Sequence, residues 1–213
     1  MPTIDVVSDV ICPWCFIGKR RLEKALKLLD SPLDVQVAWR PFQLNPQMPP
    51  EGVERRAYRT SKFGSWDRSL ALDAQVAAAA AEDGITFGFD RMTRTPNTFD
   101  AHRLIWLAQR LGVQDAVVEK LFRGYFEDGL NLNDRPTLVH LAADGGIQAS
   151  AAERLLAGDE GKAEVLREEA HYKSLGVSGV PAFFLNGKPA FSGAVAPAML
   201  ADAIREAGPV QSA

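Results

Sequence analysis

The two cysteines of this 213-residue chain, Cys12 and Cys15, are separated by only two residues. Thiols at this spacing can close into a disulfide, or act one after the other on a disulfide of another molecule. The chain holds no further cysteine that could serve as a relay, so the pair must exchange with an outside partner. The spacing therefore points to thiol chemistry.

Cys12 lies at the predicted N-terminus of a helix, just before Pro13, a residue that the first helical turn tolerates. Unpaired N–H groups and the positive end of the helix dipole favour an anion there, so we expect a lowered pKa for Cys12. Cys15 lies one turn further in, sheltered but within reach of Cys12, and is suited to resolve a mixed disulfide. The intervening Pro13 and Trp14 are candidate substrate contacts.

Two other interpretations of the pair are a zinc site and a pair of merely structural core cysteines. Zinc needs four ligands, and the histidines His102, His140 and His171 are scattered along the chain. We therefore predict no metal site. Cysteine is often buried in protein cores, but a position between a strand and a helix favours redox chemistry.

Hydrophobic periodicity predicts a strand, a helix and a second strand around the pair, at 4–7, 14–29 and 33–39. Helices are then predicted at 53–62, 66–82, 98–111, 114–126, 137–143, 151–157 and 160–175. The chain ends with strands at 181–185 and 188–192 and a helix at 197–207. Asn186-Gly187 between those two strands is a strong hairpin signal.

This order of elements predicts an α/β platform formed by residues 1–45 and 176–213, with an inserted all-helical domain at 46–175. Several helix boundaries carry their own signals. Residues 150–153, Ser-Ala-Ala-Glu, have the spacing of a capping box. Three glycines, at positions 112, 129 and 176, are placed as left-handed helix ends.

The segment 176–181, Gly-Val-Ser-Gly-Val-Pro, leads into the last pair of strands. Proline cannot donate to a β-ladder, and the cis form is essentially confined to bonds that precede proline. The Val180–Pro181 bond is therefore free to be cis. If Val180 lies beside Cys12, its backbone can pair with an extended substrate near the substrate's own cysteine.

Composition excludes several classes of protein. A net charge of −3 and a pI of about 5.7 provide no basic surface for nucleic acid. No run of about 18 apolar residues predicts a membrane helix, and no secretory signal precedes the first strand. We therefore expect a cytoplasmic protein, where a lone cysteine pair is more often catalytic or metal-binding than structural.

Three segments together resemble the DsbA-type thioredoxin-fold oxidoreductases, and most of all their cytoplasmic FrnE-like branch. They are residues 9–19, which contain Cys-Pro-Trp-Cys, residues 39–46, Trp-Arg-Pro-Phe-Gln-Leu-Asn-Pro, and residues 176–184. Residues 97–104 also resemble an element of that branch. The resemblance implies a thioredoxin fold with an inserted helical domain, Cys12 as nucleophile, Cys15 as its partner, and a cis proline at Pro181.

On this resemblance we predict a protein-disulfide oxidoreductase or isomerase that exchanges disulfides with a protein or small-molecule thiol through a mixed disulfide. The alternative is a glutathione-dependent isomerase or transferase of a small organic substrate, like the related hydroxychromene-carboxylate isomerases and kappa-class glutathione transferases. Those relatives generally carry serine at the position of Cys12, and residues 192–196 here lack the carboxylate that holds their glutathione. A polypeptide-binding module with a vestigial dithiol is a third hypothesis.

Two further residues are candidate substrate contacts. His102 has a pKa range that suits proton shuttling, although a histidine on an amphipathic helix is more often solvated or packed. Asn45 either contacts the substrate or simply turns the chain. We predict no cofactor beyond glutathione as a candidate co-substrate, and the inserted helices offer candidate surfaces for a homodimer.

Overall fold

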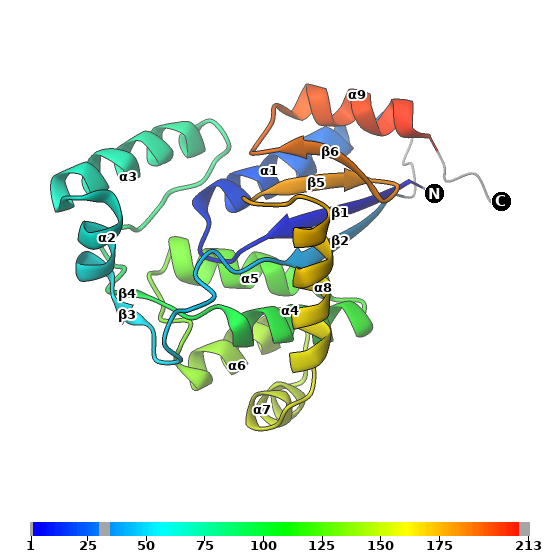
Figure 1. Ribbon diagram of the computed structural model, residues 1–213. Helices are drawn as coiled ribbons and strands as arrows, with labels where there is room; N and C mark the ends of the chain where they lie inside the picture. Colours follow the sequence, from blue (N-terminus) through cyan, green and yellow to red (C-terminus); the bar gives the residue numbers. More distant parts are fainter. Residues whose placement is uncertain (1, 30–34, 209–213) are drawn as a thin grey trace.

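The computed structural model describes residues 2–29 and 35–208. This part of the chain contains a mixed four-stranded sheet in the order β2-β1-β5-β6 (Figure 1). The strands are β1 (Thr3–Ser8), β2 (Gln36–Pro41), β5 (Ala182–Leu185) and β6 (Lys188–Ser192). β1 runs parallel to β2 and antiparallel to β5, and the register places Val6 between Trp39 and Phe183. The two ends of the chain therefore meet across β1.

Helices surround the sheet, and most of them lie between β2 and β5 in the sequence. Their bounds are α1 (Pro13–Lys27), α2 (Arg55–Phe63), α3 (Trp66–Ala81), α4 (Phe99–Arg110), α5 (Gln114–Phe126), α6 (Arg135–Asp144), α7 (Ala149–Ala157), α8 (Lys162–Ser174) and α9 (Pro197–Ala207). Each predicted helix is present, with ends that differ by at most two residues. The predicted order of elements is confirmed, whereas the division into two domains at 46–175 stays a prediction.

Successive strand residues point to opposite faces of the sheet, and different helices cover those faces. Val6 and Phe183 belong to the apolar cluster that also holds α1 and α9, which pack against each other (Figure 1). Val7 and Phe184 face α8, where the ring centroid of Tyr172 lies 5.1 Å from that of Phe184. No helix in the described part of the chain combines the length and the apolar character that crossing a membrane requires.

Two short strands that periodicity did not reveal precede the helices α2 and α4. β3 (Val53–Glu54) pairs antiparallel with β4 (Arg94–Thr95). The helix predicted from residue 53 therefore begins at Arg55, because Val53 and Glu54 are held in the extended ladder. The Glu54 carboxylate accepts from the N–H groups of Arg56 and Ala57 and caps the helix at that point.

The predicted capping box at residues 150–153 is wrong. Helix α7 begins at Ala149 with Gln148 as its N-cap, and no side chain caps it, so Ser150 already lies inside the first turn. Strand β2 also lies later than predicted and continues to Pro41, because Ser8 of β1 still pairs with it there. The predicted strand residues 33 and 34 lie outside the described residues.

The turn predictions that rest on glycine are confirmed. The backbone φ angles are +72° at Gly112, +72° at Gly129 and +91° at Gly176, in the left-handed region that favours glycine. Asn186 and Gly187 both have positive φ, at +50° and +74°. Two consecutive positive φ angles define the hairpin turn that the Asn-Gly pair predicts.

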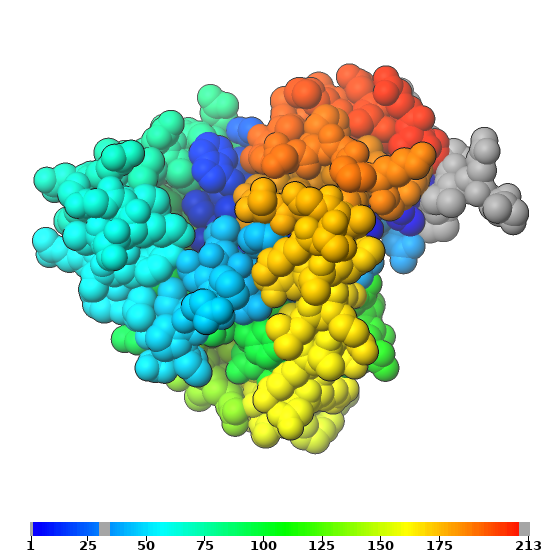
Figure 2. Space-filling model, in the orientation of Figure 1, coloured from blue at the N-terminus to red at the C-terminus, as the bar shows by residue number. Residues whose placement is uncertain are grey.

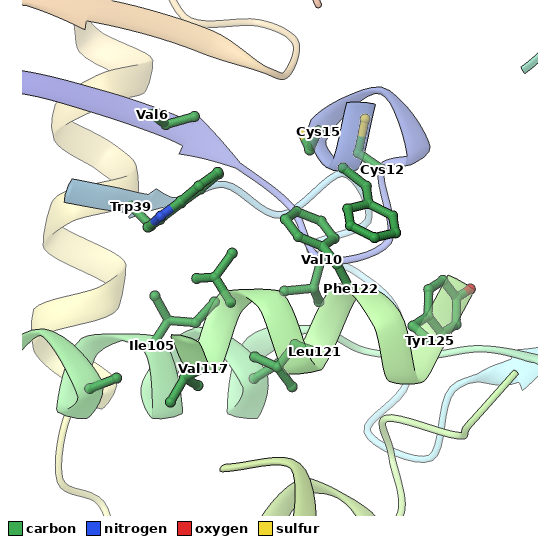
Figure 3. Packing of buried hydrophobic residues seen from close by; sticks show 14 of the residues in the cluster. Val6, Val10, Cys12, Cys15, Trp39, Ile105, Val117, Leu121, Phe122 and Tyr125 are labelled. Atoms are coloured by element: carbon green, nitrogen blue, oxygen red, sulfur yellow. The ribbon is translucent and has the colours of Figure 1, made fainter. Parts of the chain in front are cut away.

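A cluster of aromatic side chains packs α1 against α5 (Figure 3). The ring of Phe16 in α1 stacks on Phe122 and Phe126 of α5, with centroids 5.2 and 6.2 Å apart. Trp39 of β2 meets Phe122 edge to face at 6.2 Å. All four rings are buried. The first turns of α1, which carry the cysteine pair, are therefore held in place by packing against α5.

Candidate active site

The dithiol lies at the start of α1, directly after the loop that follows β1 (Figure 3). Cys12 is the N-cap residue with extended backbone, and its carbonyl accepts from the N–H groups of Cys15 and Phe16. Pro13 occupies the first helical turn, where its missing N–H leaves no bond unmade. The two thiols are free; Cys12 is 5% exposed and Cys15 is fully buried. Only Cys12 is open to an outside molecule.

Cys12 meets a backbone carbonyl from the other end of the chain. Its thiol donates to the carbonyl oxygen of Val180, with sulfur and oxygen 3.5 Å apart. The Val180–Pro181 peptide bond is cis. Gly18 allows this approach, because a Cβ there would lie 3.2 Å from Cγ of Pro181. The fold thus brings together Cys12, Val180 and Pro181, which sequence reasoning had singled out separately.

The surroundings of Cys15 hold it as a neutral thiol. Burial raises the pKa of Cys15 well above its usual value, and the neighbouring Cys12 raises it further. The negative charge of Asp9 acts in the same direction, while a hydrogen bond with the Asp9 backbone opposes them. Because a buried thiolate loses its hydration, Cys15 needs a proton acceptor before it can act as a nucleophile.

A buried carboxylate that sequence reasoning missed lies next to the dithiol. Asp9 is fully buried, and its backbone carbonyl accepts from the N–H of Cys12 at 3.0 Å. Its Oδ2 accepts from the N–H of Leu44 at 2.7 Å. Among the described residues, Oδ1 is the one fully buried side-chain nitrogen or oxygen that has no hydrogen-bond partner. The available signal was an acidic residue directly after a buried strand.

His102 faces this carboxylate and does not line the cavity beside Cys12. It is 2% exposed, and its Nε2 lies 3.5 Å from Oδ1 of Asp9 and 3.1 Å from the carbonyl oxygen of Phe42. A neutral imidazole can hold a proton on either ring nitrogen. Because the Phe42 carbonyl oxygen only accepts, Nε2 is the ring nitrogen that carries the hydrogen in this contact. His102 as a direct substrate contact stays a prediction without support from its position.

A cavity of about 280 Å³ opens beside Cys12. Three of the predicted substrate contacts, Pro13, Trp14 and Asn45, line it together with Cys12. Figure 2 shows blue atoms from the start of the chain recessed between the cyan atoms of α2 and α3 and the orange atoms of the C-terminal strands. The polar and charged residues in the rest of the wall are Arg55, Tyr58, Arg59, Lys62, Asp73, Thr95 and Tyr125.

Within residues 2–29 and 35–208, no three His, Cys, Asp or Glu side chains come close enough together to hold a metal ion.

Asn45, which could have been only a turn residue, accepts a hydrogen bond from the Tyr58 hydroxyl at the edge of the cavity. Substrate binding by Pro13, Trp14 and Asn45 stays a prediction.

The family model for the DSBA-like thioredoxin domain matches residues 3–205. The chain belongs to this family. The match covers nearly the whole described chain and confirms the predicted thioredoxin fold and the DsbA-type resemblance. This fold is the one on which DsbA-like thiol–disulfide oxidoreductases are built.

Individual relatives of this DsbA-like chain agree with the family match. The uncharacterized protein YwbO of Bacillus subtilis is 28% identical over 148 residues, which cover 70% of this chain and 68% of YwbO. The crystal structure of a probable DsbA oxidoreductase from Streptomyces coelicolor is 31% identical with a TM-score of 0.89, and the match covers 100% of this chain and 92% of that one.

Two more distant structures share only the fold with this DsbA-like chain. A 2-hydroxychromene-2-carboxylate isomerase is 16% identical, with a TM-score of 0.67 and coverage of 96% of this chain and 95% of that one. The cytosolic disulfide reductase DsbM from Pseudomonas aeruginosa, solved with GSH, is 20% identical, with a TM-score of 0.64 and 96% coverage of both chains. The family match and the Streptomyces coelicolor structure are consistent with the predicted FrnE-like branch.

Proposed function

We propose that this chain is a thiol–disulfide oxidoreductase in which Cys12 is the nucleophile and Cys15 resolves the mixed disulfide. The position of Cys12 carries the proposal. It is an N-cap thiol that borders the cavity and lies 3.5 Å from the Val180 carbonyl oxygen, with Cys15 buried behind it. A substrate sulfur reaches Cys12 from the cavity, while Val180 offers backbone groups to an extended substrate.

The first step forms a mixed disulfide. The Cys12 thiolate attacks one sulfur of the substrate disulfide, the substrate's S–S bond breaks, and the other sulfur leaves as a thiolate. The new S–S bond joins Cys12 to the half of the substrate that stays in the site. Cys15 takes no part in this step, because its raised pKa keeps it protonated.

The second step releases the substrate. Cys15 gives up its proton and attacks the sulfur of Cys12, which forms the Cys12–Cys15 disulfide and expels the second substrate thiolate. Two electrons have then passed from the dithiol to the substrate. Asp9 is the proposed acceptor of the Cys15 proton, and Nε2 of His102 lies 3.5 Å from its Oδ1. An external dithiol or the cellular thiol pool restores the reduced pair.

Reduction of insulin by dithiothreitol tests the two cysteine roles. Cys12→Ser is expected to abolish the acceleration of insulin reduction, because the attacking sulfur is lost. Incubated with insulin in the absence of dithiothreitol, reduced Cys15→Ser is expected to accumulate a mixed disulfide, visible as a mass increase that later addition of dithiothreitol removes. The matched control, Cys12→Ser/Cys15→Ser, traps nothing. Unchanged insulin reduction in the Cys12→Ser chain would refute the assignment.

A glutathione-dependent isomerase or transferase of a small organic substrate is the second candidate. The cavity beside Cys12 favours it, since about 280 Å³ is close to the size of known small-molecule sites. Calorimetry with reduced glutathione separates the two candidates, because an isomerase or transferase binds glutathione without oxidising it. Absence of binding removes this candidate. For either function we propose a cytoplasmic location, where the dithiol is kept reduced.

A further inference from the structure

The charge of the cavity beside Cys12 is uneven. Three cationic residues, Arg55, Arg59 and Lys62, line it against a single carboxylate, Asp73. All four come from the helices α2 and α3. Much of the remaining wall is apolar and includes the side chains of Phe89 and Phe126 along with several aliphatic residues. The cavity is thus an apolar space with excess positive charge on one wall.

Arg55 brings a guanidinium with unpaired N–H donors into this wall. It is 3% exposed, and its Nη2 donates to Oδ2 of Asp73 at 2.6 Å. Within the described part of the chain, the guanidinium makes no other hydrogen bond, although it carries five N–H donors. In the described part of the chain, no Arg55 nitrogen is both fully buried and unpartnered, so the remaining donors keep some exposure where Arg55 lines the cavity. An anion in the cavity can accept hydrogen bonds from these donors. Arg55 is therefore prepared for an acceptor that enters the cavity.

Arg59 shares the Asp73 carboxylate with Arg55. Its Nη2 donates to Oδ1 of Asp73 at 2.6 Å, and its Nε donates to the hydroxyl of Ser69. Burial lowers the pKa of Arg59, and the positive charge of Arg55 adds to this effect while Asp73 opposes it. One carboxylate between two guanidiniums leaves a net positive charge. Lys62, exposed at the cavity edge, adds a third cation.

We propose that this cavity receives the body of a small disulfide that carries a carboxylate on an apolar, ring-like frame. The proposal rests on the exchange chemistry proposed for Cys12. The carboxylate pairs with the free donors of Arg55 and Arg59, and the ring packs against the aromatic wall. The Cys12 thiolate attacks the nearer sulfur, and the distal half leaves as a thiolate. The carboxylated half stays bound until Cys15 attacks Cys12 and expels it as the second thiolate.

Single-turnover oxidation of the reduced protein tests this selectivity with two aromatic disulfides, the dicarboxylate dithiobis(nitrobenzoate) and the uncharged dithiodipyridine. Arg59→Met and Lys62→Met are the test variants, and Lys62 is exposed, so its loss leaves the fold intact. Arg56→Met is the matched control, because Arg56 is an exposed arginine of α2 outside the cavity wall. The test variants are expected to slow the dicarboxylate about tenfold while the uncharged probe changes less than about twofold. Arg56→Met leaves both rates unchanged.

A binding measurement separates the cavity from the exchange chemistry. The chain has only two cysteines, so Cys12→Ser/Cys15→Ser contains no thiol and binds dithiobis(nitrobenzoate) without reacting. Calorimetry is expected to show binding that Arg59→Met weakens about tenfold. Binding with this dependence, but no reaction in the wild-type chain, would overturn the exchange and keep the anion site. The anion site would be overturned, even where exchange proceeds, if the test variants slowed oxidation by both probes equally. It would also be overturned if Arg56→Met slowed oxidation by the dicarboxylate as much as the test variants do.

Discussion

The buried thiol of Cys15 makes the stability of the reduced protein depend on pH above neutrality. Burial raises the pKa of Cys15 well above its usual value, whereas an unfolded chain releases this proton near pH ~8.5. Deprotonation therefore favours the unfolded state. The contribution of Cys15 to stability is fully present below pH ~8.5 and is lost as the pH rises toward the pKa in the folded state.

The size of the loss follows from one proton. Relative to acidic solution, the free energy of unfolding falls by about 0.1 kcal/mol at pH ~7.5 and by about 1.4 kcal/mol at pH ~9.5. Buried tyrosines add to the loss mainly at higher pH. Burial raises the pKa of Tyr172 to about 12, and the usual tyrosine pKa is about 10, so at pH ~9.5 Tyr172 lowers the free energy of unfolding by only about 0.2 kcal/mol.

The comparison that isolates Cys15 uses Cys12→Ala and Cys12→Ala/Cys15→Ala, because Cys15 is then the only thiol that differs between the two chains. We expect urea unfolding to show that, between pH ~7.5 and pH ~9.5, the free energy of unfolding of Cys12→Ala falls by about 1.3 kcal/mol more than that of the double variant. If the two chains lose the same amount, the thiol titrates alike in the folded and unfolded states, and the assignment of a buried, neutral Cys15 is refuted.

Two further predictions concern the proton acceptor and the helix packing. Asp9→Asn is expected to slow the second thiolate release in single-turnover kinetics by about 10²-fold near neutral pH, with the first release unchanged. The loss should shrink as the pH rises, since bulk base then removes the Cys15 proton; equal slowing of both releases would instead indicate a structural role. Gly145→Ala is expected to destabilise the chain by about 1–3 kcal/mol in urea unfolding, because a Cβ there lies 2.7 Å from Cα of Val117 in α5. Gly158→Ala is the control, with its nearest contact at 3.5 Å and an expected change within about 0.5 kcal/mol, and equal effects of the two substitutions would contradict the packing argument.

Local signals in the sequence predicted most of the elements and the core of the site. Two examples are the Cys12–Cys15 pair between a strand and a helix and the Asn186-Gly187 hairpin. Both depend on the backbone preferences of a few neighbouring residues. Such preferences act whatever the rest of the chain does. The capping box at residues 150–153 failed locally, since the helix already begins at Ala149. The start of the helix predicted from residue 53 failed because a distant contact decides it. β3 forms because Glu54 pairs with Arg94 in an antiparallel ladder. Strands of two residues each are too short to show a hydrophobic periodicity in the sequence.

Tertiary structure alone decided what surrounds the dithiol. Cys12 meets the carbonyl of Val180, 168 positions away, because β5 pairs with β1. Asp9 became the neighbour of a buried thiol, and His102 turned toward Asp9 instead of the cavity. Arg55 is one of 24 basic residues, and nothing in its local sequence distinguishes it. The sequence by itself determined which atoms can react, since reactivity belongs to residue type and local backbone. The packing of elements determined which charges and which cavity those atoms face, because that depends on contacts between segments far apart in the chain.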